Sequence, residues 1–242
     1  MMRTLLLLAC LFVGVFANAQ ELKIPKAHYP TLPKSGSTVD DFVPKGWKIE
    51  MQAKGDLNSD GLEDVVFLLQ EDNPKNIVKN SGSGEDILNT NPRILAIIFA
   101  ESNERYSLAL SNRTFIPRYT NPLISDYIES GAISVGKNVL LLNFSFPLIG
   151  ASVANYGFTF RWQNNRFELI GYDSTETNRA SLDTTDISIN YSTRKAKILC
   201  SNAGSDEKGK VTWQKLSSNK IWTIDNIGNG LEFNPSVRAA CE

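Results

Sequence analysis

Apolar residues recur at every second position over much of this chain, and this spacing is what most limits its fold. Phe158, Phe160 and Trp162, for example, share one face of an extended segment, and polar residues alternate with them. Side chains of a β-strand repeat with period two, whereas an amphipathic helix needs apolar residues three and four positions apart. The sequence therefore predicts a mainly β protein with little helix.

Short polar turns divide the alternating segments into consecutive hairpins, and such turns favour antiparallel pairing. The expected strand pairs are 93–100 with 106–110, 132–135 with 139–146, 156–162 with 167–172, 187–191 with 195–200, and 210–216 with 221–224. Residues 93–100 are almost continuously apolar, which is typical of a central strand. The only helical signal is one capped turn near residues 37–42. We expect antiparallel sheets arranged as a sandwich or as one strongly curved sheet.

The expected domain organisation has four parts. Residues 1–19 read as a signal peptide, 20–36 as an extended N-terminal arm, and 37–242 as a single β-rich domain. Within that domain, residues 71–92 form a long polar loop, and loops of this length are uncommon in compact domains. Hydrophobic residues make up 42% of the chain, enough to form a packed core.

The N-terminus has the features of an export signal. Arg3 supplies positive charge, Leu5 to Phe16 is apolar, and Ala17-Asn18-Ala19 matches a cleavage site. The apolar run is shorter than the roughly 20 residues that span a bilayer. We therefore expect a periplasmic or extracellular protein without a membrane span. Lipid anchoring at Cys10 is the minor alternative.

Residues 56–64 are the strongest candidate for a ligand site. Asp56, Asn58, Asp60 and Asp64 supply side-chain oxygens at alternating positions, and Leu62 would add its backbone carbonyl. Ca²⁺ prefers six to eight oxygen ligands, and the glycine at position 61 suits a sharp turn. The loop thus predicts a bound calcium ion. A metal-free turn rich in Asp and Asn is the alternative.

The flanking residues distinguish this loop from a helix–loop–helix calcium hand. Phe67 occupies the twelfth position, where the hand requires a glutamate, and strands are expected on both sides. The pattern Asp-x-Asn-x-Asp-Gly-x-x-Asp followed by a strand resembles the FG-GAP calcium loops of integrin-type β-propeller repeats. A complete propeller is excluded because the loop occurs only once.

Three further segments extend the resemblance. They are Phe-Val-Pro-Lys-Gly-Trp at 42–47, Asn-Pro-Arg-Ile-Leu at 91–95, and Phe-Glu-Leu-Ile-Gly-Tyr-Asp at 167–173. With the calcium loop, they make the chain similar to a group of uncharacterised exported bacterial proteins. That group implies no activity.

Cys200 and Cys241 are the only cysteines after the predicted leader. Exported proteins seldom keep free thiols, so we expect these two to form a disulfide. Two separate thiols are the alternative. Neither a C-x-x-C redox motif nor the three Cys or His ligands expected of a zinc site are present.

The sequence offers little material for catalysis, and we assign no catalytic residue. The single histidine, His28, lies in the proline-rich arm, which leaves no basis for a triad. A carbohydrate hydrolase using paired carboxylates is the alternative function. Its candidate acids are Asp126, Glu129, Asp173, Glu176, Asp183 and Asp186.

Charge does not identify a partner. The chain has 25 basic and 26 acidic residues in a mixed pattern, so nucleic acid is not expected. Tryptophans 47, 162, 213 and 222, with Tyr156 and Tyr172, could form a stacking surface, although most such residues belong to cores. We expect a non-catalytic binding or envelope-associated protein whose ligand is an unidentified protein or glycan.

Overall fold

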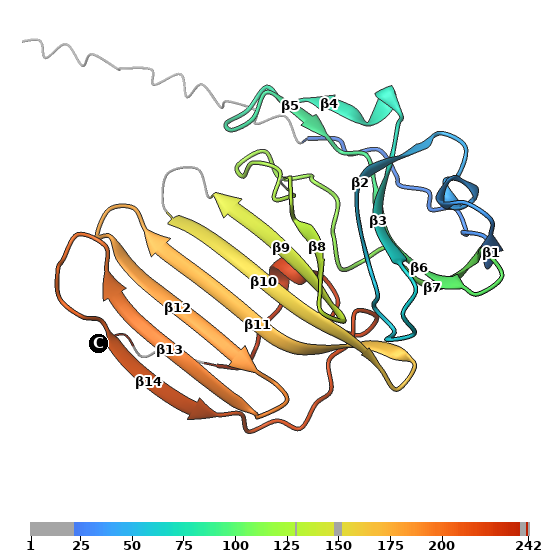
Figure 1. Ribbon diagram of the computed structural model, residues 1–242. Coiled ribbons are helices and arrows are strands. Elements are labelled where there is room, and N and C mark those ends of the chain that lie inside the picture. The colour runs from blue at the N-terminus through green and yellow to red at the C-terminus, as the bar shows by residue number, and fades with distance from the viewer. Residues whose placement is uncertain (1–21, 129, 148–151, 238–240, 242) are drawn as a thin grey trace, which may run out of the picture.

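The computed structural model describes residues 22–128, 130–147, 152–237 and 241. The predicted signal peptide, Cys10 and Glu129 lie outside these residues. The mainly β, antiparallel architecture predicted from the sequence is confirmed. Figure 1 shows the two larger sheets and the small hairpin beside them.

The first sheet has five strands, all antiparallel to their neighbours. Their order is β1 (Ser35–Gly36), β7 (Arg105–Asn112), β6 (Arg93–Glu101), β3 (Asp64–Glu71) and β2 (Trp47–Gly55). Side chains on both faces of β3 and β6 are buried, which accounts for their nearly continuous apolar sequences.

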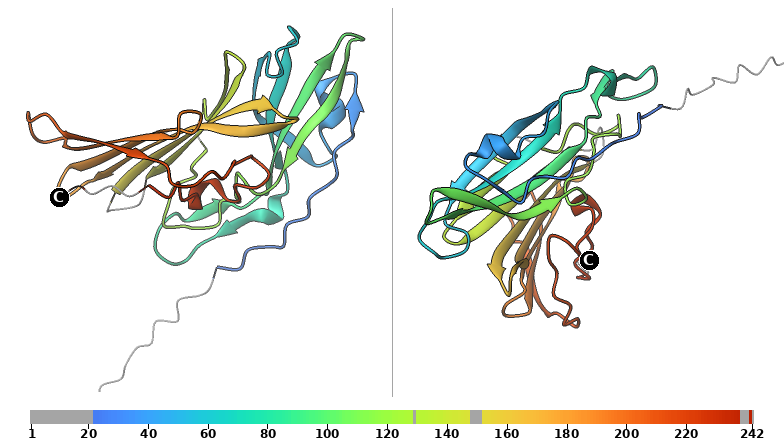
Figure 2. Two further views of the ribbon diagram at one scale, coloured as in Figure 1. Left: turned by 90° about the horizontal axis from the view of Figure 1, so that it is seen from below. Right: turned by 90° about the vertical axis from the view of Figure 1, so that its right-hand side faces the viewer.

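The second sheet has seven strands, joined to one another in sequence order. They are β8 (Ile133–Gly136), β9 (Val139–Pro147), β10 (Ser152–Gln163), β11 (Arg166–Asn178), β12 (Asp183–Asn190), β13 (Lys195–Asn202) and β14 (Lys210–Lys215). This meander is what consecutive hairpins produce. In Figures 1 and 2, the end formed by β12–β14 extends away from the five-stranded sheet.

The main hydrophobic core lies between these two sheets. Its buried residues include Val66, Leu68 and Ile97 from the first sheet and Phe158 and Phe160 from the second. A smaller core covers the opposite face of the first sheet. There, Val65, Phe67 and Ile98 pack beneath Leu32 of the arm and Phe42 of the 3-10 turn η1 (Val39–Phe42).

The described part of the predicted arm, residues 22–36, is extended and packs against the first sheet. Leu32 is buried, the Tyr29 ring lies 6.3 Å from the Trp47 ring, and Ser35 pairs with Ser107 of β7. The arm is therefore part of the fold.

The long loop predicted at 71–92 is more ordered than its composition suggested. It contains the 3-10 turn η2 (Pro74–Asn76) and a hairpin of β4 (Ile77–Lys79) and β5 (Ile87–Asn89). Buried Asn76 donates to the Asn91 side chain, and the Thr90 hydroxyl donates to the Asn76 carbonyl. Polar side chains that bond to each other, together with Leu88 of β5 in the main core, hold this segment in place.

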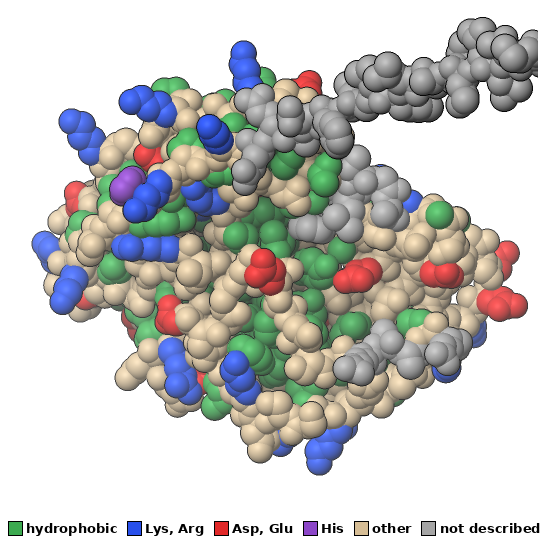
Figure 3. Space-filling model, turned by 180° about the vertical axis from the view of Figure 1, so that it is seen from behind, with side chains coloured by type: hydrophobic (Ala, Val, Ile, Leu, Met, Phe, Trp, Pro, Cys, Tyr) green, Lys and Arg blue, Asp and Glu red, His purple; other side chains and the backbone are tan. Residues whose placement is uncertain are grey.

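The strand pair predicted between 210–216 and 221–224 is wrong. Strand β14 pairs with β13, while Thr223 makes one isolated bridge to Glu168 of β11. The chain after β14 runs behind the second sheet and forms the short 3-10 turn η3 (Gly230–Glu232; Figure 2). Seen from behind, hydrophobic side chains gather in the middle of this face (Figure 3).

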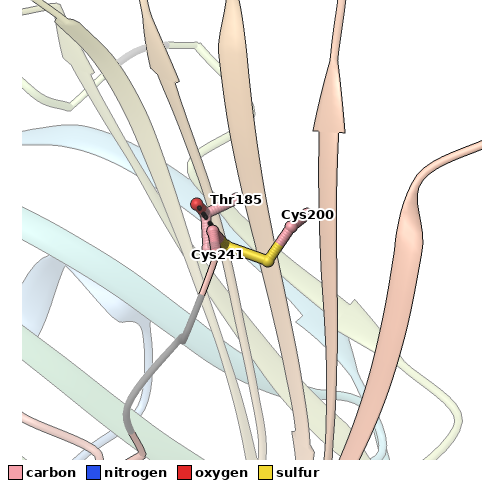
Figure 4. The surroundings of a disulfide bond; sticks show 3 residues. All are labelled: Thr185, Cys200 and Cys241. Carbon is pink, nitrogen blue, oxygen red and sulfur yellow. Dashed lines mark hydrogen bonds between the residues drawn. A yellow bond between two sulfur atoms is a disulfide. The ribbon is translucent and has the colours of Figure 1, made fainter.

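A disulfide between Cys200 of β13 and Cys241 fixes the C-terminal segment to the second sheet (Figure 4). Closer to the middle of that segment, the Phe233 ring packs 5.6 Å from Phe158 and 5.3 Å from Tyr172. We refer to residues 217–237 as the C-terminal strap.

The Cys200→Ser/Cys241→Ser variant should lose about 2–4 kcal/mol of unfolding free energy, because the cross-link closes a loop that restricts the unfolded chain. The two cysteines are separated by 41 positions. Urea denaturation of wild type and variant measures the difference. Reductant should lower the wild-type midpoint to that of the variant and leave the variant unchanged. Coincident curves for the oxidised wild type and the variant would contradict the prediction.

Candidate functional site

The loop at 56–64 connects β2 to β3 and is closed by the pairing of Gly55 with Asp64. It is thus a strand–loop–strand turn, as its flanking sequences predicted. The Asn138 side chain, in the turn between β8 and β9, donates to the Ser59 hydroxyl at 2.7 Å. Gly55 also faces Val135 so closely that an added Cβ would lie 2.7 Å from that side chain. The loop therefore lies where the two sheets meet.

Asp56 organises the exposed part of the loop. Its two carboxylate oxygens accept hydrogen bonds from the backbone N–H groups of Ser59, at 2.7 Å, and Gly61, at 3.0 Å. Both donors have positive φ, 69° at Ser59 and 85° at Gly61, so the backbone curls around the Asp56 side chain. An ionised carboxylate has about four acceptor positions, which leaves lone pairs for another ligand.

Asn58 and Asp60 lie together beside Asp56. The Asn58 side-chain nitrogen donates to Asp60 Oδ2 at 2.9 Å, and the Asn58 oxygen accepts from the Asp60 N–H. The other Asp60 oxygen accepts from the backbone N–H of Leu62 at 2.8 Å. The bonds to backbone N–H groups are those of Asx turns. Both side chains, which are predicted metal ligands, are exposed or partly exposed.

Asp64 differs from the other predicted ligands because its side chain is fully buried at the base of the loop. Its oxygens accept from the backbone N–H groups of Leu57, at 2.8 Å, and Ala100, at 3.0 Å. Burial raises the pKa of this carboxyl, backbone hydrogen bonds oppose the rise, and the nearby Asp60 charge adds to it. Among the described residues, no Lys or Arg forms an ion pair with Asp64.

The side chains as placed do not surround one point. Within the described ranges, no three His, Cys, Asp or Glu side chains form a group able to hold a metal ion. The structure brings Asp56, Asn58 and Asp60 together and sets Asp64 beneath them. The donor types still fit a hard cation, since they are carboxylate, amide and backbone oxygens.

A second charged cluster, which the sequence did not reveal, surrounds Arg93. This arginine is only 2% exposed, and its guanidinium bonds to Glu50 at 2.6 Å and 2.7 Å and to Asp126 at 2.6 Å and 3.0 Å. Burial by itself would lower the pKa of Arg93, but the two carboxylates outweigh it and raise that pKa. The cluster joins β2, β6 and the connection before β8.

In the sequence, Arg93 is visible only as the first residue of an apolar run, and its role at the centre of a charged cluster is not. Its partners are 43 and 33 positions away, and no local pattern links them. One signal for a buried ion pair was available. Arg93 begins a strand that is expected to be buried on both faces, and a buried charge needs partners of opposite charge.

Glu168 is another buried carboxylate that sequence reasoning missed. It is 5% exposed and accepts hydrogen bonds from Gln163 at 2.5 Å, Arg166 at 2.7 Å and Asn164 at 3.3 Å. Burial would raise the pKa of Glu168, but these donors outweigh it and lower that pKa. All four residues belong to the tip of the β10–β11 hairpin, so the role we assign to Glu168 is structural.

Most of the acids proposed for a hydrolase lie apart on different elements, although Asp173 and Asp186 occupy diagonal positions on one face of β11 and β12. Asp126 pairs with Arg93, Asp183 accepts from Asn202, and Asp186 accepts from the Thr175 hydroxyl. Asp173 faces a hollow of about 380 Å³ on the outer side of the second sheet and is the only acid among the described residues that line it. Glu176 faces the opposite side of that sheet because it is offset by an odd number of residues. Glu129 lies outside the described residues.

The aromatic residues do not form one platform. Tyr172 is buried, Trp162 packs against Phe99 and Phe167, and Trp222 packs against Phe233. Trp213 differs, being 64% exposed. His28 is exposed on the arm.

Comparison with family models, curated proteins and solved structures finds no match to this chain. Within the described ranges, no helix is long and apolar enough to cross a bilayer.

Replacing Arg93 by Met should lower the free energy of unfolding by about 3 kcal/mol, because it leaves Glu50 and Asp126 side by side without their cation. Chemical denaturation measures the loss. Adding Glu50→Gln and Asp126→Asn to Arg93→Met should recover part of it. Lys48→Met, which removes an exposed ion pair with Asp72, should cost less than about 1 kcal/mol. Equal losses for the Arg93 and Lys48 variants would show that the buried cluster is not important for stability.

Glu168 should make the fold acid-sensitive. Its pKa is lower in the folded than in the unfolded protein, so its stabilisation is complete above the unfolded pKa and is lost as pH falls through the folded pKa. At pH 7 the wild type should exceed Glu168→Gln by about 1–3 kcal/mol of unfolding free energy. That difference should narrow as pH falls below about 4. Denaturation curves at successive pH values measure it, with exposed Glu101→Gln as the control. A difference that stays constant or widens in acid would contradict the assignment.

Proposed function

We propose that this chain is an exported, non-catalytic binding protein in which the loop at 56–64 binds a calcium ion. The observation that carries the calcium proposal is the Asp64 carboxylate, which is buried without a cationic partner among the described residues and lies near the Asp60 charge. A divalent cation would neutralise both carboxylates.

The backbone of the loop is already close to what such a site needs. The Asp56 hydrogen bonds fix the curl, so a cation has only to reorient the Asn58 and Asp60 side chains at the surface. Asp56, Asn58 and Asp60 would supply side-chain oxygens, Leu62 its carbonyl, and Asp64 a carboxylate from below. Calcium accepts such an all-oxygen, irregular set more readily than magnesium does.

Export has independent support from the Cys200–Cys241 disulfide, because disulfides persist mainly in oxidising compartments. Calcium is abundant outside the cytoplasm, so the ion would be a permanent part of the fold. Asp186 accepts from the Thr175 hydroxyl and does not line the hollow beside Asp173, so the structure gives the hydrolase no specific support.

Calcium should raise the melting temperature of the chelator-treated protein, because an ion that binds only the folded state adds about 2.7 kcal/mol at one hundred times its dissociation constant. Magnesium should have a smaller effect. Asp56→Asn and Asp60→Asn should each reduce the calcium shift strongly, while exposed Asp206→Asn should keep it. Thermal melts with chelator, calcium and magnesium provide the measurement. A wild-type midpoint unmoved by millimolar calcium would exclude the ion.

A further inference from the structure

The outer face of β13 and β14 exposes an aromatic side chain that the fold does not use. Ala196 and Ile198 point into the core, so Lys195 and Lys197 point outward. On β14, the next strand, Trp213 is 64% exposed on this outer face. A solvent-exposed tryptophan contributes little to stability, although its ring offers a large flat surface.

Three lysines surround Trp213 on this face. Lys197 lies directly opposite Trp213 in the strand register, and Lys195 lies directly opposite Lys215. Like charges at directly opposed positions destabilise a sheet. Within the described part of the chain, the side chains of these three lysines make no recorded hydrogen bond or ion pair. The patch thus holds positive charge at some cost without an internal counter-ion.

A shallow hollow accompanies the patch. It has a volume of about 460 Å³ and is lined by Thr193, Lys195, Trp213, Gln214 and Lys215. Thr193 therefore borders the hollow together with the indole ring and two of the cations, whereas the Gln214 side chain, opposite Ala196 in the register, points to the other face. We refer to Lys195, Lys197, Trp213 and Lys215 as the Trp213 patch.

We propose that the Trp213 patch binds an anionic polysaccharide. Trp213 stacks on the apolar face of one sugar ring, and the three lysines bind carboxylate or sulfate groups of that ring and its neighbours. The inference goes beyond the calcium site, which lies in the other sheet, and it does not depend on calcium.

Two other kinds of occupant fit less well. Protein interfaces are depleted in lysine, and a stable one buries about 800 Å² on each partner around an apolar centre. Membrane surfaces are bound by larger apolar faces that enter the headgroup region, whereas Val211 is the apolar neighbour of Trp213 on its strand. Lysines also protect edge strands from aggregation, but that role does not account for an exposed tryptophan between them.

Titration calorimetry in the presence of chelator tests the proposal with polygalacturonate, dextran sulfate and neutral dextran. The wild type should bind at least one of the two charged polymers and not dextran. Trp213→Ala should weaken binding about tenfold or more, and so should Lys195→Gln/Lys197→Gln/Lys215→Gln. Because the substituted side chains are exposed, both variants should keep the wild-type melting temperature.

A charge-matched variant provides the control. Lys45→Gln/Lys75→Gln/Lys79→Gln removes three exposed lysines elsewhere and should change affinity by less than about twofold. The proposal is overturned if neither charged polymer binds, or if the control triple weakens binding as much as the patch triple. Tighter binding to phosphatidylglycerol vesicles would assign the patch to a membrane surface. Binding to oligothymidylate as tight as to the charged polysaccharides would show that the patch attracts any polyanion, and would also overturn the proposal. The patch variants should keep the rise in melting temperature that calcium causes. Failure of the polysaccharide proposal can therefore be distinguished from failure of the calcium proposal.

Discussion

Burial of the Phe115 ring against the second sheet, three residues after β7 of the first sheet ends, is the contact on which the rest of the structure depends. The ring packs 5.5 Å from Phe144, 5.0 Å from Phe158 and 5.5 Å from Phe160. Its own carbonyl accepts from the Gly230 N–H of the C-terminal strap. A Cβ at Gly230 would lie 2.7 Å from the Phe144 ring, so the strap approaches this cluster through a residue without a side chain. The Phe115 N–H donates to the Asn112 side chain at the end of β7, so this one residue connects the first sheet, the second sheet and the strap.

Polar contacts fix the positions of the elements that this apolar packing brings together. Hydrophobic attraction has no direction, whereas the bidentate bonds of Arg93 to Glu50 and Asp126 are satisfied in only one arrangement. Asp64 does the same for the loop, because it bonds to the backbone of Leu57 and of Ala100 in β6. The base of the candidate calcium loop is consequently held by buried hydrogen bonds, whereas the Asn58 and Asp60 side chains at its surface bond only within the loop.

Much of the fold could be predicted because its rules are local. Alternating residues gave the hairpins, and the apolar run at 93–100 indicated a strand buried on both faces. The packing of the arm against the first sheet, the hairpin within 71–92 and the course of the C-terminal strap could not be predicted, since they depend on contacts between distant residues. The strap illustrates the reason: Ile221 to Ile224 has the composition of a strand, yet Phe233 and the β11 backbone determine where it lies.

The sequence could predict which residues make up the candidate site but not how they are arranged in space. Sequence spacing identified Asp56, Asn58 and Asp60 as a turn of oxygen donors, and the structure places them together. Nothing in the spacing indicated that Asp64 would be buried. Trp213 was indistinguishable from the core tryptophans, because exposure depends on what packs above a strand.

The disulfide also determines how the sheet would carry mechanical load. Cys200 and Cys241 close a covalent ring that contains β14 and the strap. A pull on the edge strand of a sheet normally detaches it one hydrogen bond at a time. Here, force applied at β14 would pass through the ring to Cys200 and hence to β13. The strand that bears Trp213 is therefore joined to β13 at both ends, through residues 203–209 at one end and through the strap and the disulfide at the other.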